Sequence, residues 1–570
     1  MPAAEPTTAE QVVPEPTAGA PGPTGVLEAA VAAGVGLVLA VFFTWPAAAH
    51  PASTVPGDLG DPLYQAWQLA WGGHALLHQP LHVFDANILY PLKNTLAFSD
   101  SLLGYAPLGL VGSGVGAALV RYNVAYLLAY TLAFAGTYVL ARQLGCGRWS
   151  AAVAGLAFAY APWRYAHDGH LNILSSGGIP LALACLARGH GYPNRRPLRP
   201  AWVVAGWAVA AWQLTIGFGL GLQFSYLVGI VVVATVVTWL VRGRPALPRR
   251  LVAADAGGLA LFLLVGALLS GPYVAAVDAH PEARRSQADV ALFSPPAKAF
   301  FVAPAESRFW GPATETTRAS LASPPEQSLF PGATVLVLAL VGLVAGAFPL
   351  RRRLVLGGSA LVLTAFAMGT RFAGGRATYL LLFEHAPGWQ GVRTPGRLFT
   401  LVSLALCLLA ATGADRLLRL VRHRAASTAL GLVLVLLVAV EGLNTVGTPS
   451  PGQLPAGWSG VRGPVLQLPS DYFSDYAAML WSTEGLPQIV NGTAGFTPRE
   501  LDALRAQTAG FPDAPSVAAL RAIGVRSVLL DTTRVGGTPW QDAAARPVDG
   551  LGIGRREVGS TVLFDLSGPG

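Results

Sequence analysis

The sequence predicts a polytopic α-helical membrane protein with a small α/β domain at its C-terminal end. Of the 570 residues, 53% are hydrophobic and only 12% are charged, and the mean hydropathy is +0.49. Globular chains carry about 25% charged residues, so this composition excludes an ordinary soluble protein. Several apolar runs reach the roughly 20 residues that a helix needs to cross a bilayer. After residue 450 no long apolar run remains, and both charge signs are mixed.

The net charge of +8 does not indicate a nucleic-acid partner. The basic residues fall in short bunches between apolar runs, which is a pattern of membrane topology rather than of a binding face. Almost all of them are arginine, and Lys93 and Lys298 are the lysines. Such a preference is typical of a GC-rich bacterial genome. The three cysteines form no CxxC motif, so the sequence predicts no disulfide framework and no cysteine zinc site.

The first 25 residues are rich in proline, alanine, threonine and glutamate, and they contain no lysine or arginine. A secretory signal peptide needs a basic segment at its start, and this composition cannot bury a core. We therefore expect residues 1–25 to form a disordered cytoplasmic tail, followed by a transmembrane region over 26–450.

The arginine bunches determine the predicted topology, because short arginine-rich loops stay in the cytoplasm. All the arginine bunches lie on the cytoplasmic side only if the segment 102–118 does not cross the membrane. This segment is short and contains five glycines. The chain then has about eleven spans, with its N-terminus inside and its C-terminus outside. The predicted spans are 26–46, 122–141, 149–163, 172–187, 201–218, 222–241, 252–277, 331–350, 354–372, 398–415 and 428–446.

This topology gathers the polar loops on the extracytoplasmic side, together with residues 451–570. The loops are 47–121, 164–171, 278–330 and 373–397. In the last 120 residues, VLQLP, RSVLL and TVLFDL are typical of short strands, whereas PRELDALRAQ and SVAALRAIG are typical of helices. We therefore expect residues 451–570 to form an extracytoplasmic α/β domain.

Two acids in the first outer loop, within GDLGDPLYQAWQLAW, are the strongest candidates for chemistry. Asp58 and Asp61 follow the first apolar run, and either carboxylate can act as a general base or as a metal ligand. The alternative is that they cap a juxtamembrane helix. A helix from Asp61 places Gln65 one turn further on the same face, and Asp100 lies later in the same loop.

Two basic motifs at predicted span ends are suited to an anionic headgroup. RYAHDGHL contains Arg164, His167 and His170, and GVRTPGRLF contains Arg393 and Arg397. Arginine forks and protonated histidines bind phosphate. The alternative is that these side chains reach ordinary lipid headgroups.

These motifs together carry a resemblance to a known family. GDPLYQAWQLAW, FDANILYP, RYAHDGHL, SLFPG, GVRTPGR and PQIVNGTAGF resemble, along most of the chain, bacterial members of the GT-C superfamily of membrane glycosyltransferases. The resemblance implies a multi-pass protein of the bacterial plasma membrane with its active site outside. It implies inverting transfer of a sugar from a polyprenyl-phosphate carrier to a glycan, lipid or protein acceptor.

The resemblance also implies roles for the candidate residues. Asp61 or Asp58 is the base or orients the acceptor, and the other candidates bind the substrate or the carrier phosphate: Arg164, His167, His170, Arg393, Arg397, Gln65 and Asp100. The sequence contains no DxD motif of the kind that binds metal, so a divalent ion such as Mg²⁺ or Mn²⁺ is left open.

Two alternatives from other functional classes are a transporter or flippase for a lipid-linked saccharide and a non-catalytic factor in envelope assembly. A transporter predicts charged residues at mid-membrane depth and two related halves. An assembly factor predicts that the acidic and basic motifs share no cavity.

Overall fold

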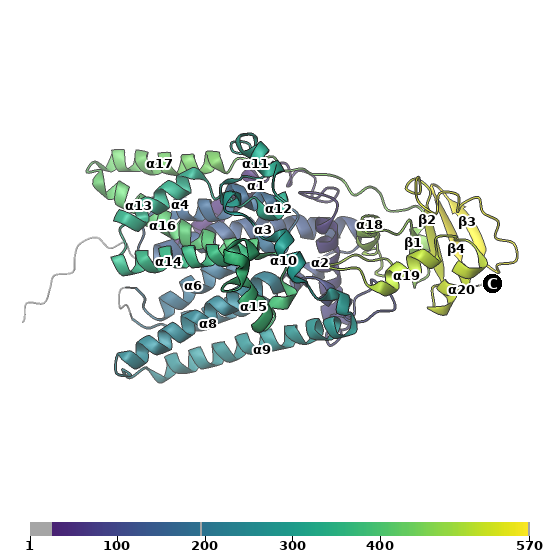
Figure 1. The fold of residues 1–570 in the computed structure, drawn as a ribbon, viewed down its shortest axis with the longest axis horizontal. Helices are drawn as coiled ribbons and strands as arrows, with labels where there is room; N and C mark the ends of the chain where they lie inside the picture. Colours follow the sequence, from purple (N-terminus) through teal and green to yellow (C-terminus); the bar gives the residue numbers. More distant parts are fainter. Residues whose placement is uncertain (1–24, 194–196, 568–570) are drawn as a thin grey trace, which may run out of the picture.

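The computed structural model describes residues 25–193 and 197–567. The predicted tail, residues 1–25, lies outside the described residues apart from Gly25. An elongated helical bundle occupies most of the molecule, and a small sheet lies at one end of its long axis (Figure 1). The bundle consists of α1 (Val26–Phe43), α2 (Asp61–His78), α3 (Gly114–Gln143), α4 (Arg148–Tyr160), α5 (Leu171–Leu174), α6 (Gly178–Gly189), α7 (Pro200–Leu214), α8 (Phe218–Val241), α9 (Arg249–Ala279), α13 (Ala333–Ala345), α14 (Leu350–Ala367), α16 (Phe399–Leu420) and α17 (Arg424–Glu441).

Seven segments of the described chain are long and apolar enough to cross a membrane. They are Val26–Phe43, Gly114–Gln143, Leu171–Gly189, Phe218–Val241, Arg249–Ala279, Pro395–Leu420 and Arg424–Glu441. The segment that contains α16 is the most buried, and α8 and α9 the least. Helix α16 therefore forms the centre of the bundle, whereas α8 and α9 form an outer hairpin (Figure 1).

These seven candidate spans are fewer than the roughly eleven that the sequence predicts. Helices α4 and α13 have 13 residues each and α7 has 15. A 13-residue helix is about 20 Å long, which is less than the thickness of the hydrocarbon core. Helix α14 has 18 residues, but three arginines lie in its first turn. An apolar run in the sequence does not show where its helix begins and ends, and so the candidate spans differ from the predicted ones.

Residues 102–118, which we expected not to cross, contain a 3₁₀ helix, Leu103–Leu110, that packs along α2. The two backbones approach closely at Gly73 and Gly109. A Cβ atom on Gly73 would lie 2.1 Å from the carbonyl carbon of Gly109. Any side chain at either position would therefore separate this segment from α2.

Four short helices lie in the long loops between the helices of the bundle. They are α10 (Gln287–Phe293), α11 (Glu315–Ala319), α12 (Pro324–Gln327) and α15 (Tyr379–His385). Ser286 and Asp289 form a capping box at the start of α10.

The C-terminal region is a four-stranded mixed sheet with three helices. Its strands have the order β1-β2-β4-β3, in which β1 and β2 are parallel and the other neighbours are antiparallel. The elements are β1 (Val465–Leu468), α18 (Ser474–Trp481), α19 (Arg499–Gln507), α20 (Ala514–Ala522), β2 (Ser527–Asp531), β3 (Gly554–Val558) and β4 (Thr561–Asp565). Strand β3 was not predicted, because four of its five residues are polar or glycine and alternation is absent.

The first outer loop joins this region to the bundle. The backbone N–H of Ile489 donates to the carbonyl of Asn87 at 2.7 Å, and that of Leu89 donates to Asn491 at 3.1 Å. The Asn87 side chain donates to the Ser482 hydroxyl at 3.1 Å, and α18 packs directly against α2. The C-terminal region is therefore held against the start of α2.

Candidate functional site

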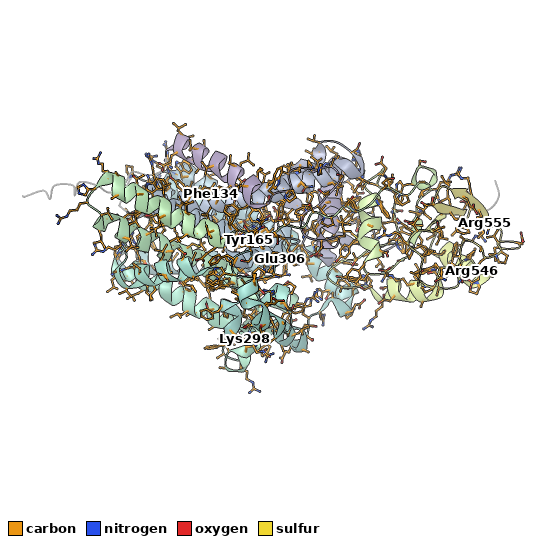
Figure 2. The ribbon with its side chains drawn as sticks, turned by 90° about the horizontal axis from the view of Figure 1, so that it is seen from above. Phe134, Tyr165, Lys298, Glu306, Arg546 and Arg555 are labelled. Atoms are coloured by element: carbon orange, nitrogen blue, oxygen red, sulfur yellow. The ribbon has the colours of Figure 1, made fainter. Side chains whose placement is uncertain are left out.

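A cavity of about 1690 Å³ lies where the bundle meets the C-terminal region. Its walls come from the start of α2, the end of α9, the loops around residues 304–328 and 387–397, and α18. Tyr165 and Glu306, which both line it, lie near the middle of the long axis, whereas Arg546 and Arg555 mark the far end of the C-terminal region (Figure 2). Residues from distant parts of the sequence therefore share one large, open site.

Asp61 lies in this cavity at the first turn of α2, followed by Pro62. One carboxylate oxygen, Oδ2, is 3.2 Å from Nε2 of His170. The other, Oδ1, accepts a hydrogen bond from the Tyr476 hydroxyl at 3.2 Å. Burial raises the pKa of Asp61, but the hydrogen bond and charge of His170 lower it more, and the net shift is downward. Asp61 is thus ionised at neutral pH and faces open space.

Asp58 also lines the cavity, but it serves the local turn. Its Oδ1 accepts from the backbone N–H of Gly60 at 2.7 Å, which is a turn contact and not a cap, since α2 has no side-chain capping hydrogen bond at its start. Asp61 makes no capping hydrogen bond at the start of α2.

His170 is the partner of Asp61, and the shifted pKa values of the two residues predict how the stability of the protein depends on pH. Burial lowers the pKa of His170, but the hydrogen bond and charge of Asp61 raise it above its usual 6.5. The stabilisation from His170 is then complete below pH 6.5 and is lost as the pH rises through the raised pKa. The contribution of Asp61 is present above its usual 3.8 and is lost as the pH falls through the lowered pKa.

We therefore expect His170→Gln to lower the unfolding temperature most between about pH 4 and about 6.5, and less at alkaline pH. Thermal unfolding of the two proteins across this range measures the difference. In an Asp61→Asn background the same substitution should have little effect, because the partner charge is gone. A difference that stays constant with pH would contradict the pairing.

His167, His170 and Glu326 form a group that can hold a metal ion. One donor atom from each lies within 4.8 Å of the other two, and Nδ1 of His167 is 3.3 Å from Nδ1 of His170. Burial lowers the pKa of His167 to about 3, so its imidazole is neutral and can donate a lone pair. Two imidazoles and one carboxylate suit Mn²⁺ or Zn²⁺ better than Mg²⁺, which prefers oxygen ligands.

Arg397 lies beside this group and is already paired. Its guanidinium donates to both oxygens of Glu326, at 2.5 Å and 3.2 Å. Burial raises the pKa of Glu326, but the charge and the hydrogen bonds of Arg397 lower it well below its usual range. Arg397 therefore holds Glu326 ionised and in place, and much of its own charge is neutralised.

Arg393 and Arg285 are two of the arginines that line the cavity, together with Arg318, Arg397 and Arg534. Within residues 25–193 and 197–567, neither guanidinium has a carboxylate oxygen within 4.0 Å. Arg393 lies over the ring of Phe293 at 5.1 Å, and Arg285 donates to the carbonyl of Gly495 at 2.8 Å. Burial, followed by the charge of Arg393, lowers the pKa of Arg285 to about 10. The two positive charges repel each other, and an anion between them would relieve this.

Gln65 and Asp100 form hydrogen-bonded parts of the cavity wall. Gln65 accepts from the backbone N–H of Leu171 at 2.9 Å and donates to Asn172 at 3.3 Å. Asp100 accepts from the Asn172 side chain and from the backbone N–H of Gly219, the latter at 3.2 Å. Both residues line the cavity, and these contacts join the first loop to the loop that carries His170.

Arg164 does not reach the cavity, so its predicted contact with a phosphate is not supported. Its side chain is fully buried and donates to Ser176 at 3.0 Å and to the carbonyl of Leu174 at 2.7 Å. Residues Pro162–His167 form a 3₁₀ helix, in which side chains three residues apart lie on one face. This helix presents Arg164 to the bundle core.

The sequence-based set of site residues missed Tyr476, Arg285, Glu326 and Asp168. Asp168 lines the cavity and accepts from the hydroxyls of Tyr126 and Tyr130 at 3.1 Å and 3.0 Å. Burial raises its pKa to about 7. Arg285, Glu326 and Asp168 are conspicuous as charged residues in loops next to apolar runs, but that signal alone did not bring them into the predicted set. Tyr476 has no such signal, since it lies on an apolar helix of the C-terminal region.

No family model and no curated protein matches the chain. Among solved structures, arabinofuranosyltransferase AftD from Mycobacteria is 17% identical, with a TM-score of 0.53 over 96% of this chain and 40% of that one. A mutant of the same enzyme has a TM-score of 0.55 over 96% and 42%. The chain therefore spans about two fifths of that protein.

The oligosaccharyltransferase AglB from Archaeoglobus fulgidus, in complex with an inhibitory peptide and a dolichol-phosphate, is 13% identical. It matches 94% of this chain and 74% of its own, with a TM-score of 0.42. The arabinofuranosyltransferase has the higher TM-scores and matches almost the whole chain. The described chain is thus a multi-span helical membrane protein with a small C-terminal sheet, and its fold is similar to that of the arabinofuranosyltransferase AftD.

Proposed function

We propose that this protein is an inverting glycosyltransferase that moves a sugar from a polyprenyl-phosphate carrier to an acceptor hydroxyl. The observation that carries the proposal is the pairing of opposite chemistries across one cavity. An ionised carboxylate, Asp61, faces the same space as two cations, Arg285 and Arg393, that have no carboxylate partner among the described residues. A general base and an anion site in one cavity are the parts that such a transfer requires.

The proposed step is a single displacement. Asp61 takes the proton of the acceptor hydroxyl while that oxygen bonds to the anomeric carbon of the sugar. The bond from this carbon to the carrier phosphate breaks, and its electron pair goes to the phosphate oxygen. Attack opposite the leaving group inverts the anomeric configuration. Arg393 and Arg285 stabilise the negative charge that develops on the phosphate.

His170 and Tyr476 orient the base in this mechanism. Each contacts a different oxygen of the Asp61 carboxylate, at 3.2 Å. A divalent ion held by His167, His170 and Glu326 would supply further positive charge beside the phosphate. The fold neighbour AftD is an arabinofuranosyltransferase, which supports a sugar transferase and leaves the sugar open.

We further propose the bacterial plasma membrane as the location, with the cavity outside. The arginine bunch in the loop between α8 and α9 lies at the end of the bundle opposite the C-terminal sheet (Figure 1). Arginine-rich loops stay in the cytoplasm, which supports an extracytoplasmic cavity and sheet. A lipid carrier and a glycan, lipid or protein acceptor can then meet at the outer surface.

The direct test is sugar transfer by the purified full-length protein in lipid, with a panel of labelled polyprenyl-phosphate sugars and analysis of the anomeric configuration. Transfer with inversion supports the proposal. Binding or movement of the lipid across the bilayer without any transfer would favour a flippase instead.

Arg393→Ala is expected to lower kcat/KM for the lipid-linked donor by about a hundredfold, because one donor to the departing phosphate is lost. Steady-state transfer rates measure this. Arg284→Ala is the matched control: Arg284 is 60% exposed and 3.8 Å from Asp278. It should change the rate by less than about twofold, since exposed ion pairs contribute little. Equal losses in both variants would indicate a general effect of surface charge.

A further inference from the structure

A second group of metal-ligand side chains lies outside the proposed reaction centre, where three parts of the chain meet. His280 follows the end of α9, Glu282 lies two residues later, and Glu500 belongs to α19. Donor atoms of these three residues lie within 4.8 Å of one another. The group therefore joins the loop after α9 to the C-terminal region.

The spacing of the three side chains fits a shared ion better than direct hydrogen bonds. Nδ1 of His280 is 3.7 Å from Oε1 of Glu282 and 3.6 Å from Oε2 of Glu500. An N–H···O hydrogen bond is about 2.9 Å long. Two ligands on a tetrahedral ion with bonds of about 2.1 Å lie about 3.4 Å apart. Small movements of the glutamate side chains bring both oxygens to that separation.

An unpartnered ring nitrogen is a second and independent sign of a ligand. His280 is 6% exposed, yet its buried Nδ1 has no hydrogen-bond partner among the described residues. The ring is held in place by Phe98 at 5.0 Å and by Phe496 at 6.0 Å. A buried polar atom without a partner costs free energy, and a metal ion at this position would remove that cost.

The carboxylates are placed to complete such a site. Oε1 of Glu282 accepts from the backbone N–H of Arg499 at 3.2 Å, which orients the carboxylate as outer-shell hydrogen bonds orient metal ligands. The Glu500 side chain is 57% exposed, so the fourth position of a tetrahedral ion is open to water. One imidazole and two carboxylates favour Zn²⁺ or Mn²⁺ over Ca²⁺ or Mg²⁺.

We infer that His280, Glu282 and Glu500 bind a divalent transition-metal ion that fastens the C-terminal region to the end of α9. The position gives this ion a role at the cavity. Arg285, three residues after Glu282, donates to the carbonyl of Gly495 at 2.8 Å across the same junction. An ion at His280 would therefore hold the two sides of the cavity rim together. The position of Arg285 depends on that rim. This site does not depend on the proposed sugar transfer.

The test is Zn²⁺ binding to the purified full-length protein after treatment with a chelator. Metal content after titration and gel filtration, together with the unfolding temperature, is compared between the wild type and the variants His280→Gln and Glu500→Gln. Each variant should bind about one Zn²⁺ fewer per chain than the wild type. Zn²⁺ should also raise the unfolding temperature less in the variants. Any ion held by His167, His170 and Glu326 is expected in the wild type and the variants alike, so it cancels when their Zn²⁺ contents are compared.

The matched control is His82→Gln. His82 is 72% exposed and 3.6 Å from Asp85, a histidine–carboxylate pair without a third donor in the groups of described residues that can hold a metal. Its Zn²⁺ content should equal that of the wild type. If His280→Gln misfolds, Glu500→Gln decides, because Glu500 is largely exposed. The inference is overturned if Glu500→Gln binds as much Zn²⁺ as the wild type, or if the wild type takes up none.

Discussion

Replacing Asp61 with asparagine is expected to slow sugar transfer by about a thousandfold, because an amide cannot accept the proton of the attacking hydroxyl. Asparagine has nearly the same shape, and its oxygen can still accept from Tyr476, which is 3.2 Å from Oδ1 of Asp61. The Asp61 side chain is 40% exposed, so the fold should tolerate the substitution. Single-turnover transfer with saturating labelled donor measures the chemical step directly.

Asp58→Asn is the matched control for this experiment. Asp58 lines the same cavity, but its Oδ1 accepts from the N–H of Gly60, and an asparagine oxygen can do the same. We expect a loss of less than about tenfold. A larger loss in Asp58→Asn than in Asp61→Asn would reverse the assignment of the base. Unchanged transfer in both variants would remove the general base from the proposal.

Asp475→Ala is expected to destabilise the C-terminal region by about 3–5 kcal/mol. The Asp475 side chain is fully buried and 2.9 Å from the guanidinium of Arg505. It also accepts from Asn491 at 2.7 Å and from the backbone N–H of Gly492 at 2.9 Å. Removing the carboxylate leaves the mostly buried Arg505 without its main partner, and the donors of Ser470, Asn491 and Gly492 lose their acceptor.

This loss reaches the reaction centre, because Asp475 is the neighbour of Tyr476 on α18. Amide hydrogen exchange of β1 and α18 measures the loosening, and a change of about 4 kcal/mol corresponds to about a thousandfold faster exchange. Asp502→Ala is the control, since Asp502 also pairs with Arg505, at 3.3 Å, but is 64% exposed. It should cost less than about 1 kcal/mol. Similar effects of both variants would contradict a buried network.

The class of the protein and part of its site could be predicted from local patterns. Length and hydropathy are sums over neighbouring residues, so the membrane class, the polar loops and three of the four strands followed from composition and alternation. Asp61, His170 and Arg393 were found because charged residues next to apolar runs are conspicuous. The number of spans could not be read in this way, because helix ends depend on capping and packing.

Contacts between residues far apart in the chain could not be predicted from the sequence, for a physical reason. Arg164 and His170 lie in one motif, yet a 3₁₀ helix directs Arg164 into the core, while His170 pairs with Asp61. Glu326 pairs with Arg397 and Tyr476 with Asp61 across long stretches of chain.

The sequence by itself therefore determined that this is a multi-span membrane protein with an acid and arginines in the loops between its apolar runs, since those properties are local. Only the tertiary structure decided which acid faces the cavity, which arginines remain without a carboxylate partner in the described chain, and that the C-terminal region supplies Tyr476. Those outcomes depend on how whole helices pack, and packing brings together side chains whose separation in the chain carries no signal.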